Sequence, residues 1–155
     1  MPIKTIAVAA CKVQVFLLDP GNLAQWTVHR ALFKQDGRWY EIRRAATADR
    51  ALTAVALQVS AQELPHQRTS IVFQWQAGNR VEFILQQLGP NSCELSAQLS
   101  SQLPPEKLQT MQKLLTIELG ILQALMERDG ARSRLQNIPA EHWIFMQEYH
   151  LNMYT

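Results

Sequence analysis

Residues 11–26, CKVQVFLLDPGNLAQW, constrain the fold more than any other stretch of the chain. Apolar residues lie on both sides of Asp19-Pro20-Gly21, a triplet that ends one helix and allows a second to begin. A short alternating segment at 3–8 precedes them, and strand-like sequence follows at once. We therefore expect the order strand, helix, helix, and then strands.

Six short segments after Trp26 alternate with the period of two that is typical of strands. Asp36-Gly37 separates the first two, and this dipeptide is a strong hairpin signal. The segments are 31–34, 38–43, 52–59, 71–76, 81–85 and 93–99. Consecutive strands joined by short turns predict an antiparallel meander.

The longest periodic segment, 106–129, has apolar residues at spacings of three and four. Pro105 suits its first turn, and Gly130 suits the position just after its end. A helix of this length measures roughly 36 Å, enough to cross a curved sheet and cover its apolar face. The elements together predict an α+β fold.

Composition limits the remaining possibilities. The 155 residues suit one domain, 47% of them are hydrophobic, and the net charge of +2 comes from scattered residues. Clustered Lys and Arg would indicate a nucleic-acid partner. Because the charges are scattered, we expect no nucleic acid as a partner.

Cys11 and Cys93 lack CxxC spacing, so we interpret both as reduced structural residues of a cytoplasmic protein. No run approaches the ~18 apolar residues of a membrane span, so we expect no integral membrane association.

Motifs for metal, cofactor or nucleophilic chemistry are not evident. The four histidines are spread out, and the closest two stand eight residues apart, unlike HExxH. The serines lack nucleophile-elbow glycines, and the six glycines stand singly. We expect no metal, no cofactor and no hydrolase triad.

The order β, α, α, six β, long α resembles the helix-grip fold of the START-like (SRPBCC) superfamily and its polyketide cyclase/dehydratase-like group. Residues 15–23, VFLLDPGNL, and Trp26 resemble the family signature, in which apolar residues end in Asp-Pro, a small or acidic residue, Asn, Leu and then Trp. The resemblance covers about 3–129. It implies a helix-grip domain over 1–130, with a curved seven-stranded antiparallel sheet around the long C-terminal helix. It also implies a cavity between sheet and helix that takes apolar molecules.

If that fold is correct, one set of apolar residues faces the cavity. The set is Trp39, Val55, Leu57, Phe73, Trp75, Phe83, Leu85 and Leu99 from the sheet, with Met111, Leu115, Leu119 and Leu122 from the helix. The same side chains would also fill a solid core, and for most of them core filling is the stronger interpretation. A cavity below about 300 Å³, or one filled by Trp75 and Phe83, would count against ligand binding.

Glu41 and Glu82 have two interpretations. Either could be a buried acid whose pKa is raised by desolvation, as a general acid requires. The favoured interpretation is a solvated strand carboxylate paired with a nearby arginine among Arg43, Arg44 and Arg80.

Residues 131–155 form a C-terminal extension that we expect to be helical from about Pro139. It is rich in aromatic residues and Met: Trp143, Phe145, Met146, Tyr149 and Met153. These side chains would close the cavity mouth or dock on a second subunit, and packing within the chain is favoured over a homodimer.

Three functions are compatible with these features. The first is binding or carriage of an apolar or amphipathic small molecule, such as a lipid, polyketide or isoprenoid-like compound. The second is an aromatase/cyclase-type enzyme acting on a polyketide-like substrate. The third is a protein-interaction module using the tail and a sheet edge. Because no acid–base constellation is visible, binding without catalysis is favoured.

Overall fold

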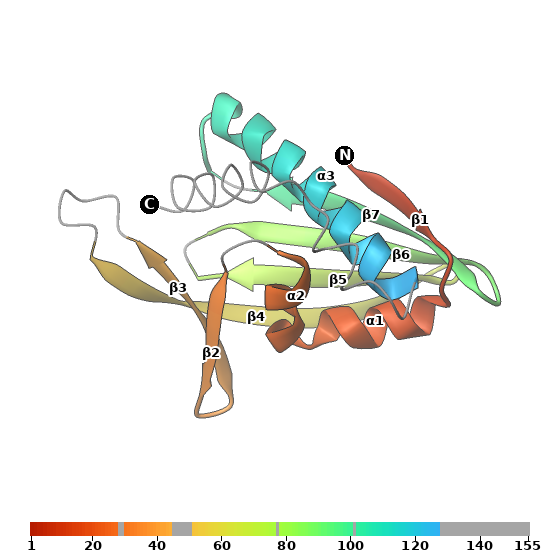
Figure 1. The fold of residues 1–155 in the computed structure, drawn as a ribbon, viewed down its shortest axis with the longest axis horizontal. Helices are drawn as coiled ribbons and strands as arrows, with labels where there is room; N and C mark the ends of the chain where they lie inside the picture. Colours follow the sequence, from red (N-terminus) through yellow and green to blue (C-terminus); the bar gives the residue numbers. More distant parts are fainter. Residues whose placement is uncertain (28–29, 45–50, 77, 101, 128–155) are drawn as a thin grey trace.

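The computed structural model describes residues 1–27, 30–44, 51–76, 78–100 and 102–127. Within them the elements follow the predicted order (Figure 1). They are β1 (Ile3–Ile6), α1 (Ala10–Leu18), the 3-10 helix η1 (Pro20–Asn22), α2 (Leu23–Trp26), β2 (Ala31–Gln35), β3 (Arg38–Arg44), β4 (Leu52–Leu64), β5 (Arg68–Trp75), β6 (Arg80–Gly89), β7 (Ser92–Ser100) and α3 (Pro105–Glu127).

The seven strands form one antiparallel sheet with the order β1-β7-β6-β5-β4-β3-β2. From β2 to β7 each strand pairs with its successor, as a meander requires, and β1 closes the far edge against β7. Helix α3 crosses one face of this sheet, while the β2–β3 hairpin projects from the opposite end (Figure 1). The predicted α+β helix-grip arrangement is confirmed.

The corner between the first two helices is built by its own side chains. The Asp19 carboxylate accepts a hydrogen bond from the Gly21 N–H at 3.0 Å, and Pro20 occupies the first turn of η1. The Asn22 amide donates to the Phe16 carbonyl at 3.0 Å. These bonds satisfy backbone groups where two helices end and begin, so the chain reverses direction within a few residues.

Helix α3 is anchored at its C-terminal end to the first strand. The Gln123 side chain donates to the Thr5 carbonyl at 2.9 Å, and the Ala7 N–H donates to Glu127 Oε1 at 2.9 Å. The predicted helix end at 128–129, Gly130 and the extension 131–155 lie outside the described residues.

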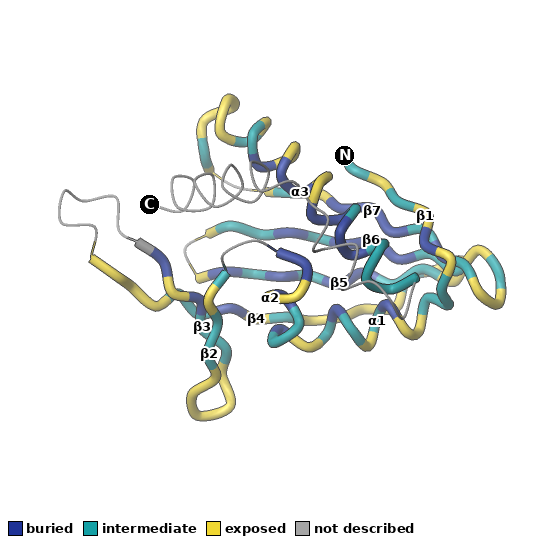
Figure 2. Tube along the Cα trace, in the orientation of Figure 1, coloured by how far each residue is buried: buried dark blue, intermediate teal, exposed yellow. Residues whose placement is uncertain are grey.

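Aromatic side chains fill the centre between α3, the N-terminal helices and the sheet. Phe83 makes edge-to-face contacts with Phe73, at 5.4 Å between ring centroids, and with Trp26, at 6.0 Å. Buried positions follow the inner faces of β5, β6 and β7 (Figure 2). Such packing is the core that the alternation of these strands predicts.

The two cysteines have different surroundings. Burial raises the pKa of the Cys93 thiol to about 11, which suits the predicted structural role. Cys11, at the start of α1, is a free thiol on the surface. A buried structural role therefore fits Cys93 and not Cys11.

Candidate functional site

Strand β3 carries charge on the face that the rest of the sheet uses for apolar residues. Trp39 is opposite Leu57 and Glu41 is opposite Val55, so Trp39, Glu41 and Arg43 point inward. Glu41 is only 2% exposed and Arg43 6%, whereas Ile42, on the outer face, is 40% exposed. The strand therefore buries ions and exposes an apolar side chain, which the hydrophobic effect alone does not explain.

Glu41 is the centre of this charged cluster, which we define as Arg30, Glu41, Arg43 and Trp75. Arg30 Nη1 donates to Glu41 Oε2 at 2.6 Å, and Arg43 Nε donates to Oε1 at 2.8 Å. The Trp75 indole N–H donates to Oε2 at 3.1 Å. Both oxygens of this buried carboxylate therefore have hydrogen-bond donors, as burial of a charge demands.

The charged cluster holds Glu41 ionised. Burial acts to raise the pKa of this carboxyl, but the charges of Arg30 and Arg43 and their hydrogen bonds outweigh it, so the pKa lies below the ordinary 4.5. Both guanidinium groups also lie against the Trp75 ring, at 5.0 Å for Arg30 and 5.7 Å for Arg43. The ring of Trp75 therefore stabilises the two guanidinium groups, while its N–H stabilises the Glu41 carboxylate.

Neither sequence interpretation of Glu41 holds in full. The carboxylate is paired with Arg43 as expected, but it is buried rather than solvated, and its pKa is lowered rather than raised. Glu82 is half-buried and accepts a hydrogen bond from the Ser70 hydroxyl at 2.6 Å. The inward position of Glu41 follows from that of Trp39, because residues two positions apart on a strand point to the same face.

A small cavity lies beside the charged cluster, between β6, β7 and α3. Its volume is about 20 Å³, which is room for about one water molecule. Arg30 and Glu118 line it together with Val81, Leu99, Met111, Leu114 and Leu115. Glu118 comes from α3 and is itself buried, so two ionisable groups from opposite walls border one small space.

The residues predicted to line a cavity all lie on the inner face of the sheet or on α3. Trp39, Val55 and Leu99 are half-buried and pack against the core. The others are core residues: Leu57, Phe73, Trp75, Phe83, Leu85, Met111, Leu115, Leu119 and Leu122. Among the described residues these side chains mostly contact one another, and their role as a ligand site stays a prediction.

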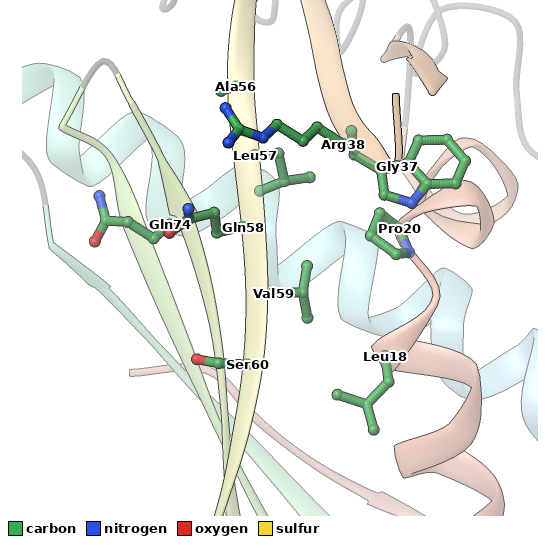
Figure 3. A pocket seen from close by; sticks show the side chains of 11 residues that line it. Leu18, Pro20, Gly37, Arg38, Ala56, Leu57, Gln58, Val59, Ser60 and Gln74 are labelled. Atoms are coloured by element: carbon green, nitrogen blue, oxygen red, sulfur yellow. The ribbon is translucent and has the colours of Figure 1, made fainter. Parts of the chain in front are cut away.

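A larger, open groove lies along the middle of β4, where its pairing with β3 ends. It has a volume of about 540 Å³ and runs between β4, the β2–β3 hairpin and the corner of α1 and η1 (Figure 3). Leu18, Pro20, Trp39, Leu57 and Val59 give it apolar walls, and Arg38, Gln58, Ser60 and Gln74 give it polar ones; Gly37 and Ala56 complete the lining. The sequence did not indicate this groove, because it exists only where a hairpin leaves its neighbouring strand.

Trp39 forms the wall at the hairpin end of the groove. A Cβ atom at Gly21 would lie 3.0 Å from Trp39 Cη2, so the indole packs directly on the glycine of the Asp19-Pro20-Gly21 corner. On the hairpin itself, Lys34 Nζ lies 6.0 Å from the centroid of the Trp39 ring. The feature that identified the fold thus also shapes the groove.

Other kinds of site find no support in the part of the chain that the structure describes. No three His, Cys, Asp or Glu side chains gather there in a way that could hold a metal ion. None of its helices is both long and apolar enough to cross a bilayer. The tail residues Trp143, Phe145, Met146, Tyr149 and Met153 lie outside the described ranges, so their predicted role as lid or interface stays a prediction.

Solved structures share this arrangement, whereas no protein-family model and no curated protein matches the chain. A hypothetical protein from Sulfolobus tokodaii has a TM-score of 0.55 at 9% identity, with 88% of this chain and 98% of that chain covered. A conserved protein from Geobacillus kaustophilus has a TM-score of 0.50 at 14% identity, with 80% and 91% covered. A START superfamily protein from Mycobacterium smegmatis follows at 0.48 and 13% identity, with 81% and 94% covered. At these identities the likeness extends to the fold alone. The comparisons therefore agree with the α+β helix-grip fold described above.

Proposed function

We propose that this chain binds an apolar or amphipathic small molecule, and that the molecule lies in the groove beside β4. The observation that carries the proposal is the contrast in volume: about 540 Å³ in the groove against about 20 Å³ between sheet and α3. Small-molecule sites typically measure roughly 300–1,000 Å³. Of these two spaces only the groove has that size. A third space, also of about 540 Å³, lies beside α3, but most of its lining side chains are polar, whereas the groove has apolar walls.

The groove walls favour a ligand with two kinds of surface. Leu18 and Pro20 offer apolar area on the side of the helical corner, while Gln58 and Gln74 offer amides on the other side of β4 (Figure 3). The Trp39 indole, which packs against Gly21 of the corner, adds further apolar area. Burial of apolar surface supplies about 25 cal/mol per Å², and the amides fix orientation. A lipid, polyketide or isoprenoid-like compound with a polar end has this combination.

Binding deep between the sheet and α3 is less well supported. A ligand there would have to displace Phe73, Phe83 and Leu119, which are each at most 1% exposed. An aromatase/cyclase activity is not favoured either, because Glu41 is held ionised and has no proton to give near neutral pH. The cavity that Arg30 and Glu118 border is too small for a polyketide-like substrate.

Ser60 and Gln62 provide a matched test of the groove. Both are exposed and lie on the same face of β4, but only Ser60 lines the groove. We expect Ser60→Trp to occupy the polar side of the groove, on the face of β4 that also carries Gln58 (Figure 3), and to weaken binding of the apolar dye Nile red at least tenfold. Gln62→Trp, which adds the same bulk outside it, should leave the affinity unchanged. The measurement is a fluorescence titration of both variants and the wild-type chain.

Equal affinities of all three proteins would contradict the proposal. Circular dichroism and the urea midpoint of each variant establish that the fold is intact, so a loss of binding cannot be a loss of structure. Native mass spectrometry of the protein from its own source would then identify a retained molecule by its mass.

A further inference from the structure

We infer that the ligand of the groove carries a peptide-like unit, an N–H and a C=O belonging to one residue, which pairs with the backbone of Val59 on the free edge of β4. This inference rests on the proposed function and names the chemical class of its ligand. It would assign to the groove an acylated amino acid amide or the end of an extended peptide.

The first step is the length of β4 against its two neighbours. β5 pairs with β4 from Leu57 to Leu64, but β3 pairs with it only from Leu52 to Leu57. Among the described residues no strand continues this ladder beyond Leu57 on the β3 side. The remaining residues of β4 are therefore an edge strand, although the first half of the same strand is central.

The second step is the direction of the backbone groups. The Gln76 N–H donates to the Ala56 carbonyl at 2.9 Å, so the groups of Ala56 point toward β5. In an antiparallel strand the direction alternates along the chain, so Gln58 and Ser60 also face β5. The N–H and C=O of Val59 then face the opposite side, where β3 has ended.

The third step is that the groove follows this edge. Consecutive residues of β4, from Ala56 to Ser60, line the groove without a gap. Side chains of a strand alternate between two faces, so a pocket on one face would be lined by every second residue only. Lining by consecutive residues means that the groove runs along the strand edge, and the Val59 side chain points from this edge toward Leu18 and Pro20 (Figure 3).

The chemistry of a matching ligand follows from these steps. An N–H and a C=O on one residue are satisfied together by the C=O and N–H of a single residue running antiparallel. Leu18 and Pro20 line the wall opposite Val59. The nitrogen of Pro20 carries no hydrogen, so it does not compete with the Val59 N–H for the ligand C=O. The groove therefore suits one amide-flanked residue with an apolar substituent.

A pair of synthetic probes tests the ligand class. N-octanoyl-valine N-methylamide has the required N–H and C=O, and in N-octanoyl-N-methylvaline N-methylamide a methyl group replaces the hydrogen of the valine N–H. We expect the first probe to bind about tenfold more tightly, since one hydrogen bond to a groove carbonyl is lost in the second. Isothermal titration calorimetry measures both affinities on the full chain.

Two proline variants test the protein side of the same bond. Val59→Pro removes the N–H that faces the groove without removing a bond to β5, which an edge strand tolerates. Ala61→Pro removes an N–H with the same direction outside the groove lining. We expect at least fivefold weaker binding of the first probe to Val59→Pro and unchanged binding to Ala61→Pro.

Amide hydrogen exchange of the unmodified chain makes the inference independent of variants that fail to fold. In the free protein the amides of Val59 and Ala61 should exchange faster than those of Gln58 and Ser60, and the first probe should slow Val59 selectively. Equal affinity of the two probes, or no slowing at Val59, would overturn the inference. If these results overturn the inference but Ser60→Trp still weakens Nile red binding, the proposed function stands alone. If Ser60→Trp leaves the affinity for Nile red unchanged, the proposed function fails as well.

Discussion

The inner surface of the sheet has two halves that are built on different principles. On β5, β6 and β7 it is apolar, and residues such as Phe73, Phe83 and Leu95 are at most 1% exposed. On the β2–β3 side the same surface carries Arg30, Glu41 and Arg43, and both arginines pair with the Glu41 carboxylate. The two halves meet at Trp75, which packs against Phe73 and donates a hydrogen bond to Glu41.

The difference between the halves concerns what each contributes to stability. The apolar half stabilises the fold through burial, at about 25 cal/mol per Å² of apolar surface. In the charged half the attraction between ions must first offset their desolvation, so the net gain is small, while loss of one ion leaves the others uncompensated. The charged half is therefore sensitive to single changes and tolerant of complete replacement.

The largest expected effect comes from breaking the charged half at its centre. Glu41→Ala leaves the guanidinium groups of Arg30 and Arg43 buried without their carboxylate, which should lower the free energy of unfolding by about 3–5 kcal/mol. Replacing all three together, with Arg30→Leu, Glu41→Met and Arg43→Leu, should recover most of the loss. Urea denaturation followed by circular dichroism measures both proteins. A triple variant less stable than Glu41→Ala would show that the three ions stabilise the folded chain more than apolar side chains in their place do.

A smaller effect separates the halves by their pH dependence. The pKa of Glu41 is below 4.5 in the folded chain, so its stabilisation is fully present above the unfolded pKa and is lost as the pH falls through the folded value. Between pH 7 and pH 3 the wild-type chain should therefore lose more stability than Glu41→Gln. Ile71→Val, in the apolar half, should cost about 0.5–1.5 kcal/mol at every pH. Parallel pH profiles of the wild-type chain and Glu41→Gln would contradict this assignment.

The apolar half could be predicted from sequence, because alternation in 71–76, 81–85 and 93–99 fixes both strand and face. The charged half could have been inferred in part: with Trp39 placed inward, period two places Glu41 and Arg43 inward as well. Arg30 gave no signal, because its contact with Glu41 depends on the β2–β3 register. The groove depends on where β3 leaves β4, which local sequence does not encode.

The smallest expected effects come from two glycines, one near each half. At Gly120 in α3 an added Cβ meets nothing within 4 Å, so Gly120→Ala should raise the free energy of unfolding by about 0.5–1 kcal/mol, as removal of a flexible residue from a helix does. At Gly21 the added Cβ lies 3.0 Å from Trp39, and the indole must move toward the groove. Gly21→Ala should therefore lower stability by about 1 kcal/mol and weaken Nile red binding, whereas Gly120→Ala should leave binding unchanged. If Gly21→Ala changed stability without changing the dye affinity, Trp39 would support the corner of α1 and η1 without forming a wall of the ligand site.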